Sequence, residues 1–81
     1  MSVTEFDETF EEVVQDVLGW DVTFDEDDGP RTLEVWDSLM QVRLVHELEG
    51  RFAVRLPDDA LLGEQTVGSL RSLVRELARP A

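Results

Sequence analysis

Three segments of this 81-residue chain carry apolar residues at every third or fourth position, and this period restricts the chain to packed helices. In residues 3–18 the apolar face comprises Val3, Phe6, Phe10, Val13, Val14 and Val17. In residues 38–52 it comprises Leu39, Val42, Val45, Leu48 and Phe52, and from residue 67 onward Val67, Leu70, Leu73, Val74 and Leu77. No stretch alternates long enough to predict a strand, and residues 52–56, the nearest to one, are better interpreted as a connector.

The ends of these segments carry residues that begin and end helices. Ser2 and Glu5 fit a capping box at the start of the first helix, and Gly19 suits its C-terminal end. Thr66 fits the N-cap of the last helix, which Pro80 is expected to end. We therefore predict an all-α fold, a small four-helix bundle of three main helices and one short helix, with a long first loop.

Residues 19–36 lack a helical period and include an acidic turn at 25–30, which predicts a long loop. Loops of this length are uncommon in compact domains unless they are functional or anchored. The apolar residues expected to anchor this loop to the core are Trp20, Val22, Phe24, Leu33 and Trp36. Farther on, Pro57 and Asp58 predict a short helix that carries Leu61 and Leu62.

The length predicts a single domain over residues 1–81. The chain has no cysteine, which excludes disulfides and thiol chemistry from its own side chains. No run approaches the roughly 18 apolar residues of a membrane span, and the first residues lack the pattern of a secretory signal. We expect a cytoplasmic protein that does not contact the membrane.

The net charge of −12 is concentrated in the first half of the chain. Residues 1–38 hold 13 acidic residues and one arginine, whereas residues 39–81 hold six of each kind. Such a field repels nucleic acid and attracts basic protein surfaces, so we expect protein partners and no nucleic acid. The acidic loop does not fit an EF-hand: with Gly29 at position 6, Phe24 falls at position 1 and Val35 at position 12, so we expect no metal site.

The segment Trp36–Asp37–Ser38–Leu39 places one hydroxyl at the first turn of the second helix. Asp and Ser are favoured at helix starts because their oxygens accept hydrogen bonds from unpaired backbone N–H groups. A serine in this place is expected to be exposed, and the positive end of the helix dipole favours a phosphate attached to it. A Ser–His hydrolase is excluded, because His46 lies eight residues, or about 12 Å of helix rise, from Ser38.

This pattern resembles the acyl carrier protein family over essentially the whole chain. The resemblance rests on Asp37–Ser38–Leu39 and, at matching spacing downstream, on Val42, Leu44, Val45, Leu48, Glu49, Phe52, Leu56–Pro57–Asp58 and Thr66–Val67. It implies a carrier that is not itself an enzyme, with 4′-phosphopantetheine attached to Ser38 and acyl intermediates held on it as thioesters. It also implies that Asp37 either caps the helix or helps to orient the metal and coenzyme during attachment.

The resemblance further implies a set of protein partners. These are a phosphopantetheinyl transferase, an acyl-loading enzyme (an acyltransferase or an adenylating ligase), and a ketosynthase or other acyl-processing enzyme. The carrier itself is expected to be a monomer. The partner-binding residues expected on the second helix are Leu39, Met40, Val42, Arg43, His46, Glu47 and Glu49. Of these, Met40 and similarly Leu39 are expected to be exposed beside Ser38. Gln41 is expected on the same docking face.

The sequence departs from the family pattern at some positions, and these departures narrow the kind of carrier expected. Val35–Trp36 replaces the Gly–Gly usual in peptidyl carriers, and Arg43 and His46 interrupt the acidic stripe usual in fatty-acid carriers. These departures favour a discrete carrier of a specialised, polyketide-type pathway. An aminoacyl or peptidyl carrier and an unmodified acidic interaction module remain as alternatives. If an acyl chain enters the bundle, the residues expected to line it are Leu39, Val42, Val45, Leu61 and Leu62.

Overall fold

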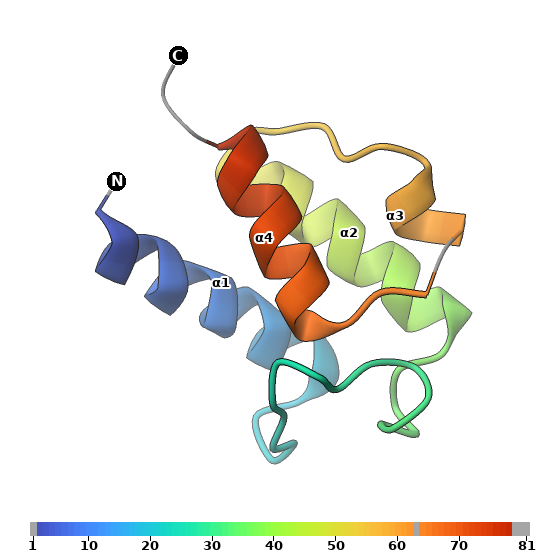
Figure 1. Cartoon of the computed structure of the whole chain (residues 1–81). Coiled ribbons are helices and arrows are strands. Elements are labelled where there is room, and N and C mark those ends of the chain that lie inside the picture. The colour runs from blue at the N-terminus through green and yellow to red at the C-terminus, as the bar shows by residue number, and fades with distance from the viewer. Residues whose placement is uncertain (1, 63, 79–81) are drawn as a thin grey trace.

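The computed structural model describes residues 2–62 and 64–78, and within these ranges the chain is helical with no strand (Figure 1). The helices are α1 (Val3–Leu18), α2 (Ser38–Phe52), α3 (Asp59–Leu62) and α4 (Val67–Leu77). A long loop joins α1 to α2, and residues 53–58 form the connector to α3. The prediction of a small helical bundle with three main helices, one short helix and a long first loop is confirmed.

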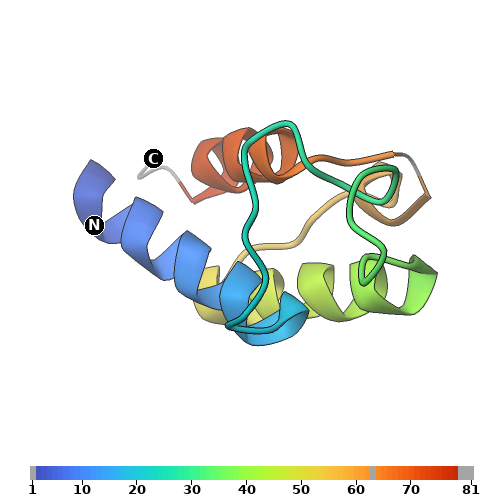
Figure 2. The same cartoon turned by 90° about the horizontal axis from the view of Figure 1, so that it is seen from below.

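Helix α1 runs antiparallel to both α2 and α4 (Figure 2). At the start of α1, the ring centroid of Phe6 lies 5.0 Å from that of Phe52, at the end of α2. Asp7 forms ion pairs with Arg71, near the middle of α4, and with Arg75, in its last turn, and the next turn of α1 reaches Arg71 through Glu11. The first residues of α1 therefore lie at the same end of the molecule as the last turns of α2 and α4.

The core lies between these helices and the end of the long loop. Its largest fully buried side chains are Trp36, Phe10, Leu44, Leu48, Leu70, Val13, Val14, Val67 and Val74. Most of the predicted apolar faces of α1 and α4 point into this core. The exceptions are Val3 and Leu77, which stand 69% and 42% exposed because they belong to the terminal turns, where little chain remains to cover them.

The apolar residues of α2 do not all face the core. Leu39 and Val42, which lie on its apolar face in the sequence and were also expected to bind partners, are 70% and 49% exposed. The buried side chains are instead Gln41, Leu44, Val45 and Leu48, which also follow helical spacing. Both sets are compatible with the period of the sequence. The positions of α1 and α3 against α2 decide which set is buried.

Each main helix begins at its predicted cap. The Ser2 hydroxyl accepts a hydrogen bond from the Glu5 N–H at 3.1 Å. A reciprocal capping box forms at α4, where Thr66 and Ser69 exchange side chain–backbone bonds of 3.0 and 2.8 Å. Gly19 follows α1 with φ +115°, a backbone conformation that favours glycine. Helix α4 ends at Leu77, and the predicted stop at Pro80 lies outside the described residues.

The long loop is tied to the core and to the start of α4. Val22, Phe24 and Leu33 pack partly buried against the core, and Trp36 is 1% exposed. The prediction that Trp20 also anchors the loop is wrong. Its ring is 68% exposed, and its indole N–H donates to Asp16 of α1 at 2.7 Å.

Two carbonyls of the loop cap α4. Val67 N–H donates to the Asp28 carbonyl at 2.9 Å, and Gly68 N–H donates to the Glu26 carbonyl at 2.8 Å. The Asp28 carboxylate is itself held, since it accepts hydrogen bonds from the Asp25 N–H and the Thr32 hydroxyl, both at 2.7 Å. The bond from Asp25, and then that from Thr32, lowers the pKa of Asp28. The acidic turn is therefore an ordered cap for α4 as well as a charged surface.

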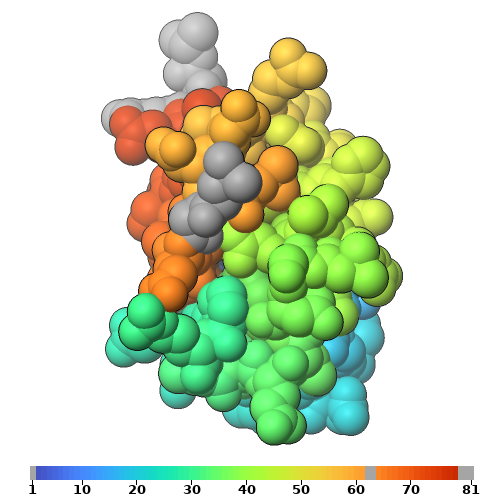
Figure 3. All heavy atoms as spheres, turned by 90° about the vertical axis from the view of Figure 1, so that its right-hand side faces the viewer, coloured from blue at the N-terminus to red at the C-terminus, as the bar shows by residue number. Residues whose placement is uncertain are grey.

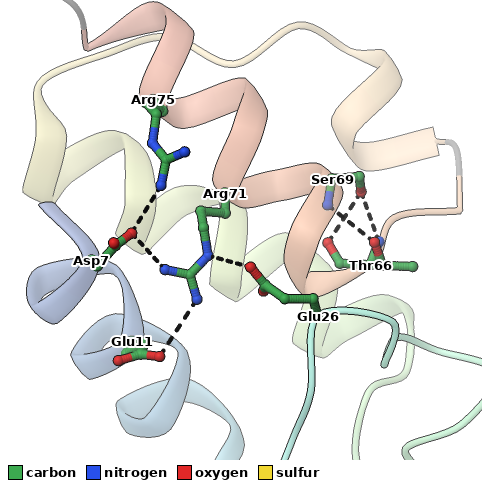
Figure 4. A network of polar contacts seen from close by, with 7 residues as sticks. All are labelled: Asp7, Glu11, Glu26, Thr66, Ser69, Arg71 and Arg75. Carbon is green, nitrogen blue, oxygen red and sulfur yellow. Dashed lines mark hydrogen bonds and ion pairs between the residues drawn. The ribbon is translucent and has the colours of Figure 1, made fainter. Parts of the chain in front are cut away.

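Arg71 joins α4 to α1 and the loop (Figure 4). Its side chain is only 13% exposed, and its Nη1 lies 2.7 Å from Asp7. Its Nε lies 2.7 Å from Glu26 and forms an ion pair with it, although the Nε–H does not point directly at the carboxylate oxygen. The guanidinium also lies over the Phe10 ring, 4.9 Å from its centroid. Burial opposes the charge, but the bond to Asp7 and the attraction of Glu26 outweigh it and raise the pKa of Arg71.

Candidate functional site

Ser38 occupies the first helical position of α2, and its side chain is exposed. Figure 3 looks onto the end of the molecule where α2 begins, and the residues around this start form much of that face. Within the part of the chain that the structure describes, no hydrogen bond engages the Ser38 hydroxyl. This hydroxyl is therefore accessible from solvent and available for covalent modification.

Asp37, and not Ser38, caps the helix. Its backbone is extended (φ −96°, ψ −174°), and its carboxylate accepts a hydrogen bond from the Met40 N–H at 2.8 Å. The Asp37 carbonyl accepts the first bond of the helical ladder, from the Gln41 N–H at 3.0 Å. Because the preceding residue performs the capping, the serine hydroxyl is not needed for it.

Trp36 fixes the chain just before this cap. Its ring is buried, and its backbone N–H donates to the Leu33 carbonyl at 3.0 Å. Its indole N–H donates to the side-chain oxygen of Gln41 at 3.1 Å, so the loop end is bonded to the first turns of α2. The position of Ser38 is thus set by a buried aromatic residue on one side and a helix on the other.

The start of α2 is suited to a phosphate ester on Ser38. The first N–H groups of a helix and its dipole give this end a partial positive charge. The Asp37 carboxylate uses one of these N–H groups, that of Met40. The exposed hydroxyl, free of internal hydrogen bonds, fits the attachment of a phosphopantetheine arm without displacing any packed side chain.

The structure places five of the seven predicted partner-binding residues on the surface of α2. The exposed ones are Leu39, Val42, Arg43, His46 and Glu47. Their surface mixes two aliphatic side chains with charges of both signs. That these residues bind partners stays a prediction.

Three expectations for α2 require correction or refinement. Met40 was expected to be exposed, but it is half-buried and packs against the core. Gln41 was expected on the docking face, but it is 6% exposed. Glu49 is half-buried, and its carboxylate accepts a hydrogen bond from the Leu56 N–H at 2.8 Å, so it also holds the connector that follows α2.

The burial of Gln41 was missed because glutamine is usually a surface residue. The signal for it was present in the spacing. Gln41 lies three and four residues before Leu44 and Val45, and therefore on their face of the helix.

The residues predicted to line an acyl chain differ in their exposure. Val45 is buried, whereas Leu39, Val42 and Leu61 are exposed. The side chain of Leu62 lies outside the described part.

A shallow groove of about 550 Å³ lies elsewhere, between α1 and loop residues 20–24. Its lining includes Trp20, Val22 and Phe24 from the loop and Glu8 and Glu12 from α1. Ser38 does not line it. The exposed serine therefore lies outside this groove.

The fold and this site define a small all-helical domain that presents an unbonded serine hydroxyl at the start of its second helix. A family model described as a phosphopantetheine attachment site matches residues 8–74. The match covers most of the chain, and the chain belongs to this family. No curated protein and no solved structure gave a significant match.

Membership establishes the class of function. Domains of this family carry a covalent 4′-phosphopantetheine group and interact with the enzymes that modify them and process their acyl groups. They carry acyl groups without catalysing a reaction themselves. No helix in the described ranges is long and apolar enough to cross a membrane.

Proposed function

We propose that Ser38 is the residue to which phosphopantetheine is attached, and that the protein is a discrete acyl carrier of a specialised, polyketide-type pathway. The observation that carries the attachment is the exposed hydroxyl of Ser38, which no hydrogen bond engages in the described chain. Ser2, Ser69 and Ser72 lack this context. The Ser2 and Ser69 hydroxyls accept backbone N–H bonds in helix caps, and Ser72 lies within α4.

The residues around Ser38 prepare it for modification. Trp36 is buried and fixes the approach of the chain, and Asp37 caps α2 in place of the serine. The N-terminal end of α2 favours the negative charge of a phosphodiester at this position. When attached, the arm supplies the thiol that this cysteine-free chain lacks, and the thiol carries the acyl group as a thioester.

The exposed surface of α2 supports a specialised set of partners. Arg43 and His46 stand beside Glu47, so this surface lacks the uniform negative charge that would attract any basic partner. The aliphatic Leu39 and Val42 offer apolar contacts at the start of the helix. We propose that a phosphopantetheinyl transferase, an acyltransferase or adenylating ligase, and a ketosynthase or other acyl-processing enzyme dock on this mixed surface.

Intact-mass spectrometry after incubation with coenzyme A and a broad-specificity phosphopantetheinyl transferase tests the attachment. We expect wild type to gain the mass of one phosphopantetheine and Ser38→Ala to gain none. Ser72→Ala is the matched control, since it removes an exposed hydroxyl from α4 and should be modified as wild type is. A wild-type chain that stays unmodified while a known carrier reacts would remove the proposal.

Loading of the modified protein tests the kind of pathway. Transfer of a malonyl group onto the arm by an acyltransferase would support the polyketide-type assignment. Loading with an amino acid by an adenylating enzyme would replace it with an aminoacyl carrier. Binding of a basic partner with equal affinity before and after modification, and in Ser38→Ala, would indicate an interaction module instead.

A further inference from the structure

Gln41 is the one buried polar or charged residue among those the structure describes. Its side-chain N–H₂ donates to the Ala60 carbonyl of α3 at 2.8 Å and reaches the Leu61 carbonyl at 3.4 Å. Its side-chain oxygen accepts the indole N–H of Trp36 at 3.1 Å. A single amide therefore joins the loop end, α2 and α3.

This amide lies close to the attachment site. Gln41 follows Ser38 by three residues, which is nearly one helical turn or about 4.5 Å of rise. The seam between α2 and α3 that it bridges is thus adjacent to the proposed attachment point. An apolar group tethered at Ser38 would reach the interior of the bundle most directly through this seam.

We infer that the contacts of Gln41 with Trp36 and α3, here called the Gln41 latch, close the seam between α2 and α3 to apolar cargo. The inference rests on the proposed attachment at Ser38 and specifies the cargo class. Cargo that remains in solvent favours short or polar acyl groups, since a long alkyl chain would leave its apolar surface in water.

The reason is the cost of separating buried polar groups. An alkyl chain inserted between α2 and α3 would pull Gln41 away from the Ala60 carbonyl and break that bond. A buried donor or acceptor without a partner loses its hydration and gains no hydrogen bond in return. A leucine at the same position would carry no such penalty and would present an apolar wall to the chain.

Two-dimensional NMR of acyl-loaded protein tests this inference. The transferase is used to attach acetyl-, butyryl-, hexanoyl- and octanoyl-phosphopantetheine from the corresponding coenzyme A thioesters to the full chain. The reporters are the Trp36 indole N–H and the backbone N–H groups of Ala60 and Leu61. For wild type we expect these resonances to keep the same positions along the series.

Gln41→Leu should behave differently. We expect its reporter resonances to shift progressively with chain length, and its melting temperature to rise by about 4 °C or more from the acetyl to the octanoyl form. Gln15→Leu is the matched control, because it makes the same substitution on α1, where the amide bonds to Gly19 and Val22. It should keep the insensitivity of wild type.

If Gln41→Leu does not fold, Trp36→Phe is used in its place, with Ala60 and Leu61 as reporters. It removes the indole donor of the latch together with part of a buried ring. Wild-type resonances that move progressively with chain length would overturn the inference while leaving the attachment at Ser38 intact. Folded latch variants that stay as insensitive as wild type would overturn it too. A failure of the attachment itself appears earlier, as a missing mass gain, and removes the proposed function together with the latch.

Discussion

Asp37 and Ser38 have different roles at the start of α2, although either residue type could cap the helix. Both can accept a backbone N–H at a helix start, but only the carboxylate of Asp37 does so here. The next residue then belongs to the helix proper, with its hydroxyl turned to solvent. A hydroxyl on the first turn of a packed helix has a fixed position without being buried, which suits the attachment proposed at Ser38.

The cap predicts a stability effect at the residue scale. Asp37→Ala should lower the free energy of unfolding by about 1 kcal/mol, because the Met40 N–H loses its acceptor. Asp37→Asn keeps an acceptor oxygen and should remain close to wild type. Urea denaturation measures both.

Asp58→Ala is the control for the loss of an exposed acid. The Asp58 side chain is exposed, and no side-chain hydrogen bond engages it in the described ranges. We expect it to unfold at nearly the wild-type urea concentration. Equal stability of Asp37→Ala and Asp58→Ala would mean that the capping bond contributes nothing.

At the scale of elements, the long loop behaves as a fifth packing element. Its Trp36 side chain is buried in the core, and its Glu26 and Asp28 carbonyls accept hydrogen bonds from the first N–H groups of α4. The approach is so close that a Cβ at Gly29 would collide with the Gln65 carbonyl oxygen, just before α4. The loop therefore connects the start of α2, where the site lies, to the start of α4.

This close approach predicts opposite effects for two glycines. Gly29→Ala should lower the free energy of unfolding by about 1–3 kcal/mol, since the loop or the backbone before α4 must shift to admit the methyl group. Gly50→Ala places its methyl in open space within α2 and should raise stability by about 0.5–1 kcal/mol. Urea denaturation of the two variants beside wild type provides the measurement. If Gly29→Ala left the free energy of unfolding unchanged, the loop could shift at no cost and would not stabilise α4.

At the scale of the molecule, Arg71 of α4 forms its ion pairs with acidic residues in the first half of the chain. Asp7, Glu11 and Glu26 meet this arginine, and Asp7 also pairs with Arg75 at 3.0 Å. With a net charge of −12, the fold contains many carboxylates that repel one another. The two arginines of α4 place positive charge where α1 and the loop converge.

These contacts predict how stability depends on pH. The hydrogen bond from Arg71, together with the charges of Arg71 and Arg75, lowers the pKa of Asp7 below its ordinary value of 3.8. A carboxylate whose folded pKa is depressed stabilises the fold above its unfolded pKa, and this contribution disappears as the pH falls through the folded pKa. Asp7→Asn should therefore be less stable than wild type at pH 7, and the difference should shrink below about pH 4.

Urea denaturation at neutral and acidic pH tests this dependence, with Glu8→Gln as the control. Glu8 is an exposed acid of α1 that forms no ion pair within the described ranges. The control accounts for the general relief of repulsion as carboxylates become protonated. A constant difference between Asp7→Asn and wild type across this range would contradict a depressed Asp7 pKa in the folded state.

The amino-acid sequence by itself determined the helices, their caps and the place of Ser38, because periodicity, capping and turn chemistry act between residues close in the chain. α1 and α2 begin and end where the sequence predicted them to. The recurrence of apolar residues at every third or fourth position also predicted an all-helical class. Local interactions suffice for these features, since each involves residues within one or two helical turns.

Only the tertiary structure decided which side of α2 faces inward. The sequence allowed Leu39 and Val42 to be core residues, but α1 and α3 cover the face of Leu44 and Leu48 instead, and bring Gln41 inside with them. The tertiary structure also decided that Trp20 is exposed and that Arg71 forms an ion pair with Asp7, because both depend on how distant parts of the chain are placed. Burial depends on what the rest of the molecule places over a residue, and the local pattern of α2 was compatible with either face.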